Sequence, residues 1–65
     1  MQQLNTKPIL NYLEKNNLSK TDFCKKCNIS LQTLNNILTG KNFKFKTLFK
    51  IARQIDCYIK DFFND

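Results

Sequence analysis

A single glycine, Gly40, and a single proline, Pro8, interrupt this chain of 65 residues. A series of β-hairpins needs frequent turn residues, so a chain with so few of them is expected to fold into helices. Sixty-five residues form one domain with an economical core, because a domain of this size buries only about 60% of its unfolded surface. The hydrophobic fraction of 42% and the charged fraction of 25% are typical of a folded globular protein.

The apolar residues are too scattered for a membrane protein. The longest unbroken apolar run is Cys57-Tyr58-Ile59, whereas a spanning helix needs about twenty apolar residues. The N-terminus also lacks the basic-then-apolar leader of secreted proteins, so a cytoplasmic protein is expected.

The first helix is expected to begin after Asn5 or Thr6, because either side chain can cap it, and Pro8 is tolerated in a first turn. Its apolar face, at spacings of three and four residues, consists of Ile9, Leu10, Tyr12 and Leu13. Residues 15–17 are expected to end this helix, and residues 1–5 are expected to fray.

The second helix is expected to begin at a capping box formed by Ser19 and Asp22. The Ser19 hydroxyl can accept an unpaired backbone N–H, and the Asp22 carboxylate is favourable at the positive end of a helix. Its buried face consists of Phe23, Cys24 and Cys27. Asn28 follows where the chain must turn, and asparagine tolerates the left-handed conformation better than any residue except glycine.

Two further helices and a last turn are expected. Ser30 caps a third helix from Leu31 to about Leu38, and Gly40 ends it with a positive φ. The inner face of that helix consists of Leu34, Ile37 and Leu38. A fourth helix follows the loop 41–44, with Phe45, Leu48, Phe49, Ala52 and Ile55 at helical spacing. A last turn carries Ile59, Phe62 and Phe63.

The charge balance indicates a polyanionic partner. Eleven Lys and Arg residues against five Asp and Glu give a net charge of +6. Nucleic acid is the first candidate and an anionic membrane surface the second, while a basic surface kept for solubility is the plain alternative.

Enzymatic and metal-binding functions are not expected. The chain has no histidine, so the commonest general base and metal ligand are missing. Its acids are Glu14, Asp22, Asp56, Asp61 and Asp65, most of them near helix ends. Cys24 and Cys27 have the spacing of a metal or redox motif, but only Cys57 and carboxylates remain as further zinc ligands. Buried, reduced thiols are therefore expected, with no metal and no cofactor.

Two short helices separated by the turn Cys27-Asn28-Ile29 are typical of a helix-turn-helix, in which the second helix enters the major groove of DNA. From Leu18 to Phe63 the sequence resembles the Cro/repressor-type (Xre-like) helix-turn-helix family of bacterial and phage regulators. The resemblance is carried by Leu18-Ser19, Phe23-Cys24, Ile29-Ser30, Leu34, Ile37, Thr39-Gly40-Lys41, Leu48, Ile51-Ala52 and Ile55. It implies an all-α, compact five-helix, lambda-repressor-like DNA-binding domain over residues 1–65, with the helix-turn-helix at about 19–39.

The sequence departs from the family pattern at three places. Cys24 stands where the family usually has alanine, and Asn28 stands where it usually has the turn glycine. Phe43-Lys44-Phe45 precedes the fourth helix where many members have Pro-Ser.

The resemblance implies that the outward residues of the third helix contact bases. These are Leu31, Gln32, Thr33, Asn35 and Asn36. Gln32 and Asn36 are four residues apart on one helical face, and both carry the amide that pairs bidentately with adenine. No Lys or Arg lies between Leu31 and Thr39, so we expect an operator in which the contacted base pairs are mostly A·T.

The resemblance also implies phosphate contacts at the start of the second helix and around the glycine. The candidates are Lys20, Thr39, Lys41 and Asn42, with Lys44 and Lys46 as further ones. Such contacts position the domain without reading sequence and make binding depend strongly on salt. Lys25, Lys26 and Lys50 can equally be a solvated helix face.

The expected function is a transcriptional regulator, more specifically a repressor, that binds double-stranded DNA as a homodimer on a palindromic operator. No small-molecule ligand is expected. Phe43, Phe62 and Phe63 are the candidate dimer or partner seam, since the chain has more aromatic residues than so small a core needs. The alternative is a helix-turn-helix protein-interaction module that docks on a toxin or a polymerase subunit without specific DNA binding.

Overall fold

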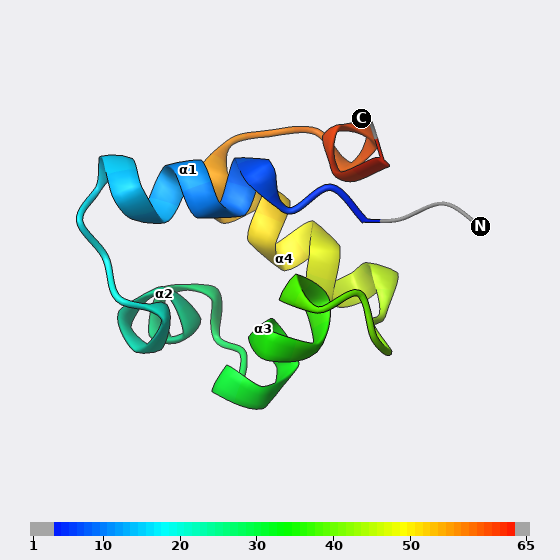
Figure 1. Cartoon of the computed structure of the whole chain (residues 1–65), viewed down its shortest axis with the longest axis horizontal. Helices are drawn as coiled ribbons and strands as arrows, with labels where there is room; N and C mark the ends of the chain where they lie inside the picture. The colour runs from blue at the N-terminus through cyan, green and yellow to red at the C-terminus, as the bar shows by residue number, and fades with distance from the viewer. Residues whose placement is uncertain (1–3, 64–65) are drawn as a thin grey trace.

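The computed structural model describes residues 4–63. In chain order they form α1 (Lys7–Lys15), α2 (Lys20–Cys27), α3 (Leu31–Leu38), α4 (Phe45–Ile55) and the 3-10 helix η1 (Ile59–Phe63), and this part of the chain contains no strand. The expected all-helical fold is confirmed. Figure 1 shows α4 in the middle of the molecule, with α1 and η1 above it and α2 and α3 below it.

Serine side chains begin the two helices that the sequence assigned to the helix-turn-helix. Ser19 Oγ accepts a hydrogen bond from the backbone N–H of Asp22, and Ser30 Oγ accepts one from the backbone N–H of Thr33, both at 3.1 Å. Each bond satisfies one of the four N–H groups that a helix start leaves unpaired. The predicted caps of α2 and α3 are therefore confirmed.

All four α-helices end in the same way, with a residue of positive φ. These residues are Asn17 (φ 52°), Asn28 (φ 59°), Gly40 (φ 73°) and Asp56 (φ 57°). The N–H of the next residue then bonds back to a carbonyl five residues earlier. These bonds join Leu18 to Leu13, Ile29 to Cys24, Lys41 to Asn36 and Cys57 to Ala52, at 2.8 to 3.0 Å. This is the Schellman arrangement, which satisfies the last carbonyls of a helix.

The residue that follows the positive-φ position is apolar at three of these four ends. Leu18, Ile29 and Cys57 are partly buried and pack against the core, which is the contact that usually accompanies the arrangement. The exception is Lys41, which is exposed. The end of α3 is thus the one helix end that presents a charge in place of a core contact.

The core is built from every element. Its buried side chains are Ile9, Leu13, Phe23, Cys24, Cys27, Leu34, Ile37, Leu48, Ile51, Ala52 and Phe62. The predicted inner faces of α2 and α3 are largely confirmed, except that Leu38 is only partly buried. Leu10, expected on the inner face of α1, is 45% exposed.

The fourth helix buries only part of the apolar set that the sequence places at helical spacing. Phe45 is 59% exposed and Phe49 is 55% exposed, although both belong to that apolar set. Leu48, Ile51 and Ala52 are the buried residues of α4. The apolar residues of this helix cover more of its circumference than the neighbouring helices can bury, so two phenylalanines remain at the surface.

The N-terminal segment is attached to the C-terminal turn. The backbone N–H of Asn5 donates to the carbonyl of Phe62, and its side-chain Nδ2 donates to the carbonyl of Asp61 at 3.2 Å. The expected fraying therefore does not include Asn5, and for residues 1–3 it lies outside the described residues. Phe62 is fully buried, so it is a core residue and is not available for the expected seam.

Candidate nucleic-acid interface

The connection between α2 and α3 has the geometry of a tight helix-turn-helix. Asn28 is left-handed, and the backbone N–H of Ile29 donates to the carbonyl of Cys24 at 3.0 Å. Cys27 is the last residue of α2, so the turn comprises residues 28–30 and lies one residue later than expected. α2 packs against both α3 and α4, which holds the two short helices in a set relative orientation.

The outer face of α3 carries the side chains that the sequence assigned to base contacts. Gln32 and Asn35 are exposed, and Leu31 is 43% exposed. Leu34 and Ile37 on the opposite face are fully buried. The helix is thus held by its apolar face, while the Gln32 amide is accessible to solvent.

Asn36 lies deeper than Gln32. It is partly buried and lines a hollow of about 470 Å³ between α3 and the start of α4. The other lining residues are Thr33, Asn42, Phe43, Lys44 and Thr47. The structure therefore brings two predicted base contacts, Thr33 and Asn36, beside two predicted phosphate contacts, Asn42 and Lys44. Thr47 was not predicted, and its only signal in the sequence is a hydroxyl in the first turn of α4.

Two threonine hydroxyls already have partners inside the domain. Thr33 Oγ1 lies 2.8 Å from Ser30 Oγ. Thr39 Oγ1 donates to the carbonyl of Asn35 at 2.9 Å and is 3.3 Å from that of Asn36. The single proton of Thr39 is therefore engaged within α3, and donation to a phosphate would require this bond to break.

The predicted phosphate contacts belong to segments on both sides of α3. Lys20 begins α2, and Lys41, Asn42, Lys44 and Lys46 follow α3, all of them exposed. In Figure 1, α2 lies on one side of α3 and the loop after α3 lies on the other. The major groove is about 12 Å wide and admits one helix. A helix lying in it therefore has a phosphate backbone on each side.

The start of α4 adds backbone donors to this set. Its N-cap residue Lys44 makes no side-chain hydrogen bond to the helix, and the first turn contains no acidic residue. The first N–H groups of a helix and its partial positive charge favour an anion there. Lys44 and Lys46 therefore lie beside a helix end whose partial positive charge no acidic residue of its first turn offsets.

The cysteines have the properties of core residues. All three thiols are free, and Cys24 and Cys27 are buried. Burial raises the pKa of each thiol, for Cys27 to about 11, with a smaller contribution from the neighbouring Cys24. Residues 4–63 contain no cluster of three or more His, Cys, Asp or Glu side chains that could hold a metal ion.

Capped helices, a left-handed turn residue and a solvent-facing third helix define a helix-turn-helix domain of the kind that binds DNA. The comparison with protein families supports this classification. The family described as helix-turn-helix matches residues 9–62, so the chain belongs to this Cro/Xre-type, DNA-binding and non-enzymatic family. No curated protein and no solved structure matches the chain. Among the described residues, none of the helices combines the length and the apolar character that crossing a bilayer requires.

Proposed function

We propose that this protein is a sequence-specific transcriptional repressor that reads double-stranded DNA with α3. The observation that carries the proposal is the exposed amide of Gln32 on a helix whose opposite face is fully buried. An exposed amide can pair with the N6 and N7 atoms of adenine only if its helix is free to enter the groove.

The proposed operator is rich in A·T at the contacted positions. α3 contains Gln32, Asn35 and Asn36 but no Lys or Arg, and Lys or Arg make the commonest contact to guanine. The Thr33 hydroxyl is engaged by Ser30, which leaves its methyl group as the natural partner of a thymine methyl. Leu31 offers a second apolar contact of this kind.

We propose that two copies bind a palindromic operator, with half-sites about one helical turn apart. An α3 of eight residues can contact only a few base pairs, so a second copy is needed for useful specificity. Phe43 and Phe63 remain the proposed seam; both are partly buried, and the ring of Phe45 contacts both, with centroids 6.3 and 6.0 Å away. The mass of the free and the DNA-bound protein, measured by analytical ultracentrifugation, tests this stoichiometry.

The proposal is tested by selecting bound sites from random duplex DNA at two salt concentrations. We expect a recovered half-site whose contacted pairs are mostly A·T. Gln32→Ala should then weaken binding by about 1–3 kcal/mol and relax selectivity at one base pair. Asn11→Ala is the matched control, because Asn11 is an exposed amide on α1, away from α3. A variant with unchanged preference at every position would contradict the role of Gln32.

A protein-interaction module is the second candidate, and the exposed rings of Phe45 and Phe49 favour it. Exposed aromatic residues that lie together are typical of protein-binding surfaces. If no duplex binds at low salt while Phe49→Ser abolishes capture of a defined partner, this second function replaces the first.

A further inference from the structure

Three cations on α4 form a row that makes no ion pair within the described part of the domain. Lys46, Lys50 and Arg53 are exposed and follow one another at spacings of four and three residues, which places them on one side of the helix. α4 contains no Asp or Glu, and none of these three cations forms an ion pair within residues 4–63. Like charges at such spacings destabilise a helix slightly, so the row is better explained by an external anion.

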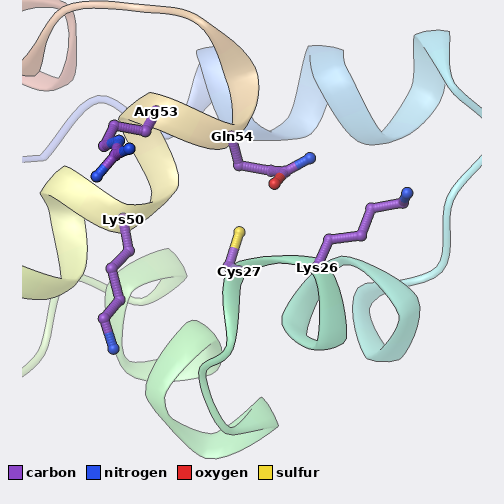
Figure 2. Close-up of a pocket in the computed structure, with 5 residues that line it drawn as sticks. All are labelled: Lys26, Cys27, Lys50, Arg53 and Gln54. Atoms are coloured by element: carbon purple, nitrogen blue, oxygen red, sulfur yellow. The ribbon is translucent and has the colours of Figure 1, made fainter.

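The row borders a hollow between α4 and the end of α2. The hollow has a volume of about 340 Å³ and is lined by Lys26, Cys27, Lys50, Arg53 and Gln54. In Figure 2, Lys50 and Arg53 lie on one side and Lys26 on the other, while the thiol of Cys27 and the amide of Gln54 lie between them. Two helices therefore contribute cations to one concave surface.

The chemistry of the lining fits an oxygen anion. Burial raises the pKa of Cys27 to about 11, so the thiol adds no negative charge at neutral pH. No carboxylate lines the hollow. Arg53 supplies a planar fork of donors, the two lysines supply point charges, and the Gln54 amide can donate a further hydrogen bond. Arginine binds phosphate bidentately and lysine binds it as a point charge, so a phosphate suits this set of donors.

The position of the hollow suggests where such phosphates come from. Lys46 is one of the predicted phosphate contacts that follow α3 in the chain. Lys50 and Arg53 extend the same row of cations along α4. The side chain of Lys50 extends towards α3 in Figure 2. Lys46 and Arg53 are seven residues apart, which corresponds to about 10 Å along the helix axis, so the row is long enough for more than one phosphate.

We infer that the hollow between α2 and α4 binds backbone phosphates of DNA that flanks the sequence read by α3. The inference rests on the proposed DNA-binding function and extends it to a separate surface. Bound flanking phosphates add affinity without adding sequence preference, and the contact requires a duplex longer than the half-site.

The test compares one half-site in a duplex of about ten base pairs with the same half-site in a duplex of about thirty. We expect the wild type to bind the longer duplex more tightly, and K50Q/R53Q to lose most of this gain. The slope of log K against log salt on the longer duplex should fall by about two for the double variant. K7Q/K15Q on α1 is the matched control and should keep the gain.

The outcomes separate this inference from the proposed function. If the wild type binds both duplexes equally, or if the double variant keeps the gain, the inference fails while the reading by α3 stands. If the double variant loses binding to the short duplex as well, the hollow is not a separate site and the inference also fails.

A second arm tests free phosphate as the source. Inorganic pyrophosphate is titrated into the protein without DNA, and the NMR signals of the Gln54 side-chain amide and of Arg53 are followed. Shifts that are absent from K50Q/R53Q, together with the gain from the longer duplex, support a phosphate site used by DNA. Shifts without that gain overturn the DNA source in favour of a free phosphate ligand. Equal shifts with an oligo-glutamate peptide would overturn selectivity for phosphate.

Discussion

The thiol of Cys24 lies 3.6 Å from the backbone carbonyl oxygen of Ser30. Because sulfur is large, this distance is compatible with a weak hydrogen bond donated by the thiol. Cys24 belongs to α2 and Ser30 caps α3, so the contact joins the two helices of the motif at the point where their relative orientation is set. The carbonyl of Ser30 also accepts a hydrogen bond from the backbone N–H of Leu34 at 3.1 Å. The Cys24 thiol is a second donor to this carbonyl, which an alanine at the same position would not supply.

Substitutions of Cys24 should depend more on size than on polarity. Cys24→Ala removes one weak hydrogen bond and is expected to cost about 1 kcal/mol of unfolding free energy or less. Cys24→Val adds bulk at a position that is only 4% exposed, and overpacking of this kind costs about 1–3 kcal/mol. Urea denaturation of the two variants measures the difference. A valine variant as stable as the alanine variant would show that α2 and α3 are not closely packed there.

A substitution at a left-handed residue should lower stability most where it replaces glycine with a residue that carries a Cβ. Gly40 has φ +73° and open space where a Cβ would be added, so Gly40→Ala meets no neighbour and its cost is conformational. We expect a loss of about 1–2 kcal/mol. Asn28→Gly, at φ 59°, is the matched control and should change stability by less, since asparagine already tolerates this conformation. Thermal unfolding of both variants decides whether backbone strain is the cause.

Lys41 should contribute to the salt dependence of DNA binding and little to stability. It is exposed at the one helix end where the usual apolar contact is replaced by a charge. Lys41→Gln is expected to lower the slope of log K against log salt by about 0.9 and to weaken binding equally across sequences. Lys15→Gln at the end of α1 is the control and should leave the slope unchanged. A slope that stays the same in Lys41→Gln would remove this residue from the phosphate contacts.

The stability of the domain should fall in alkaline solution because of its buried thiols. Burial raises the pKa of Cys27 from about 9.0 to about 11 in the folded state. Between these values the unfolded chain loses the proton while the folded chain keeps it, so unfolding becomes easier as pH rises. One such proton contributes a slope of at most about 1.4 kcal/mol per pH unit.

The control for this alkaline effect is Cys27→Ala. Its stability, measured by urea denaturation at several pH values, should decline less steeply between pH 9 and pH 11 than that of the wild type. Some decline should remain, because burial also raises the pKa of Cys24. If the two proteins lose stability in parallel across this range, Cys27 is not the titrating group.

Much of the fold could be predicted from local chemistry. The caps Ser19 and Ser30, the left-handed positions Asn28 and Gly40, and the bounds of α3 depend on hydrogen bonds within a few residues. Such bonds are determined by the residues themselves. The sequence predicted that residues 15–17 end α1 but not that Asn17 is left-handed, and the left-handed end at Asp56 was missed.

The candidate site could be predicted only in part. The exposure of Gln32 follows from the spacing of Leu34 and Ile37 on the opposite face of α3. The partial burial of Asn36, by contrast, depends on the loop after α3 and the first turn of α4, which no local pattern places. The hydrogen bond from the Thr39 hydroxyl to the carbonyl of Asn35 is local, but the family resemblance implies a phosphate contact for the same hydroxyl.

The sequence by itself determined where the helices of the motif begin and end, which side of α3 is apolar, and that the surface is basic. Caps, turns and helical periodicity act over a few residues, so they can be recognised without knowing the fold. Only the tertiary structure decided which apolar residues of α4 are buried, that Phe62 belongs to the core, and that Lys26 lies across a hollow from Lys50 and Arg53 (Figure 2). Those outcomes depend on how much of each helix its neighbours can cover, and contacts between distant segments are a property of the whole packed chain.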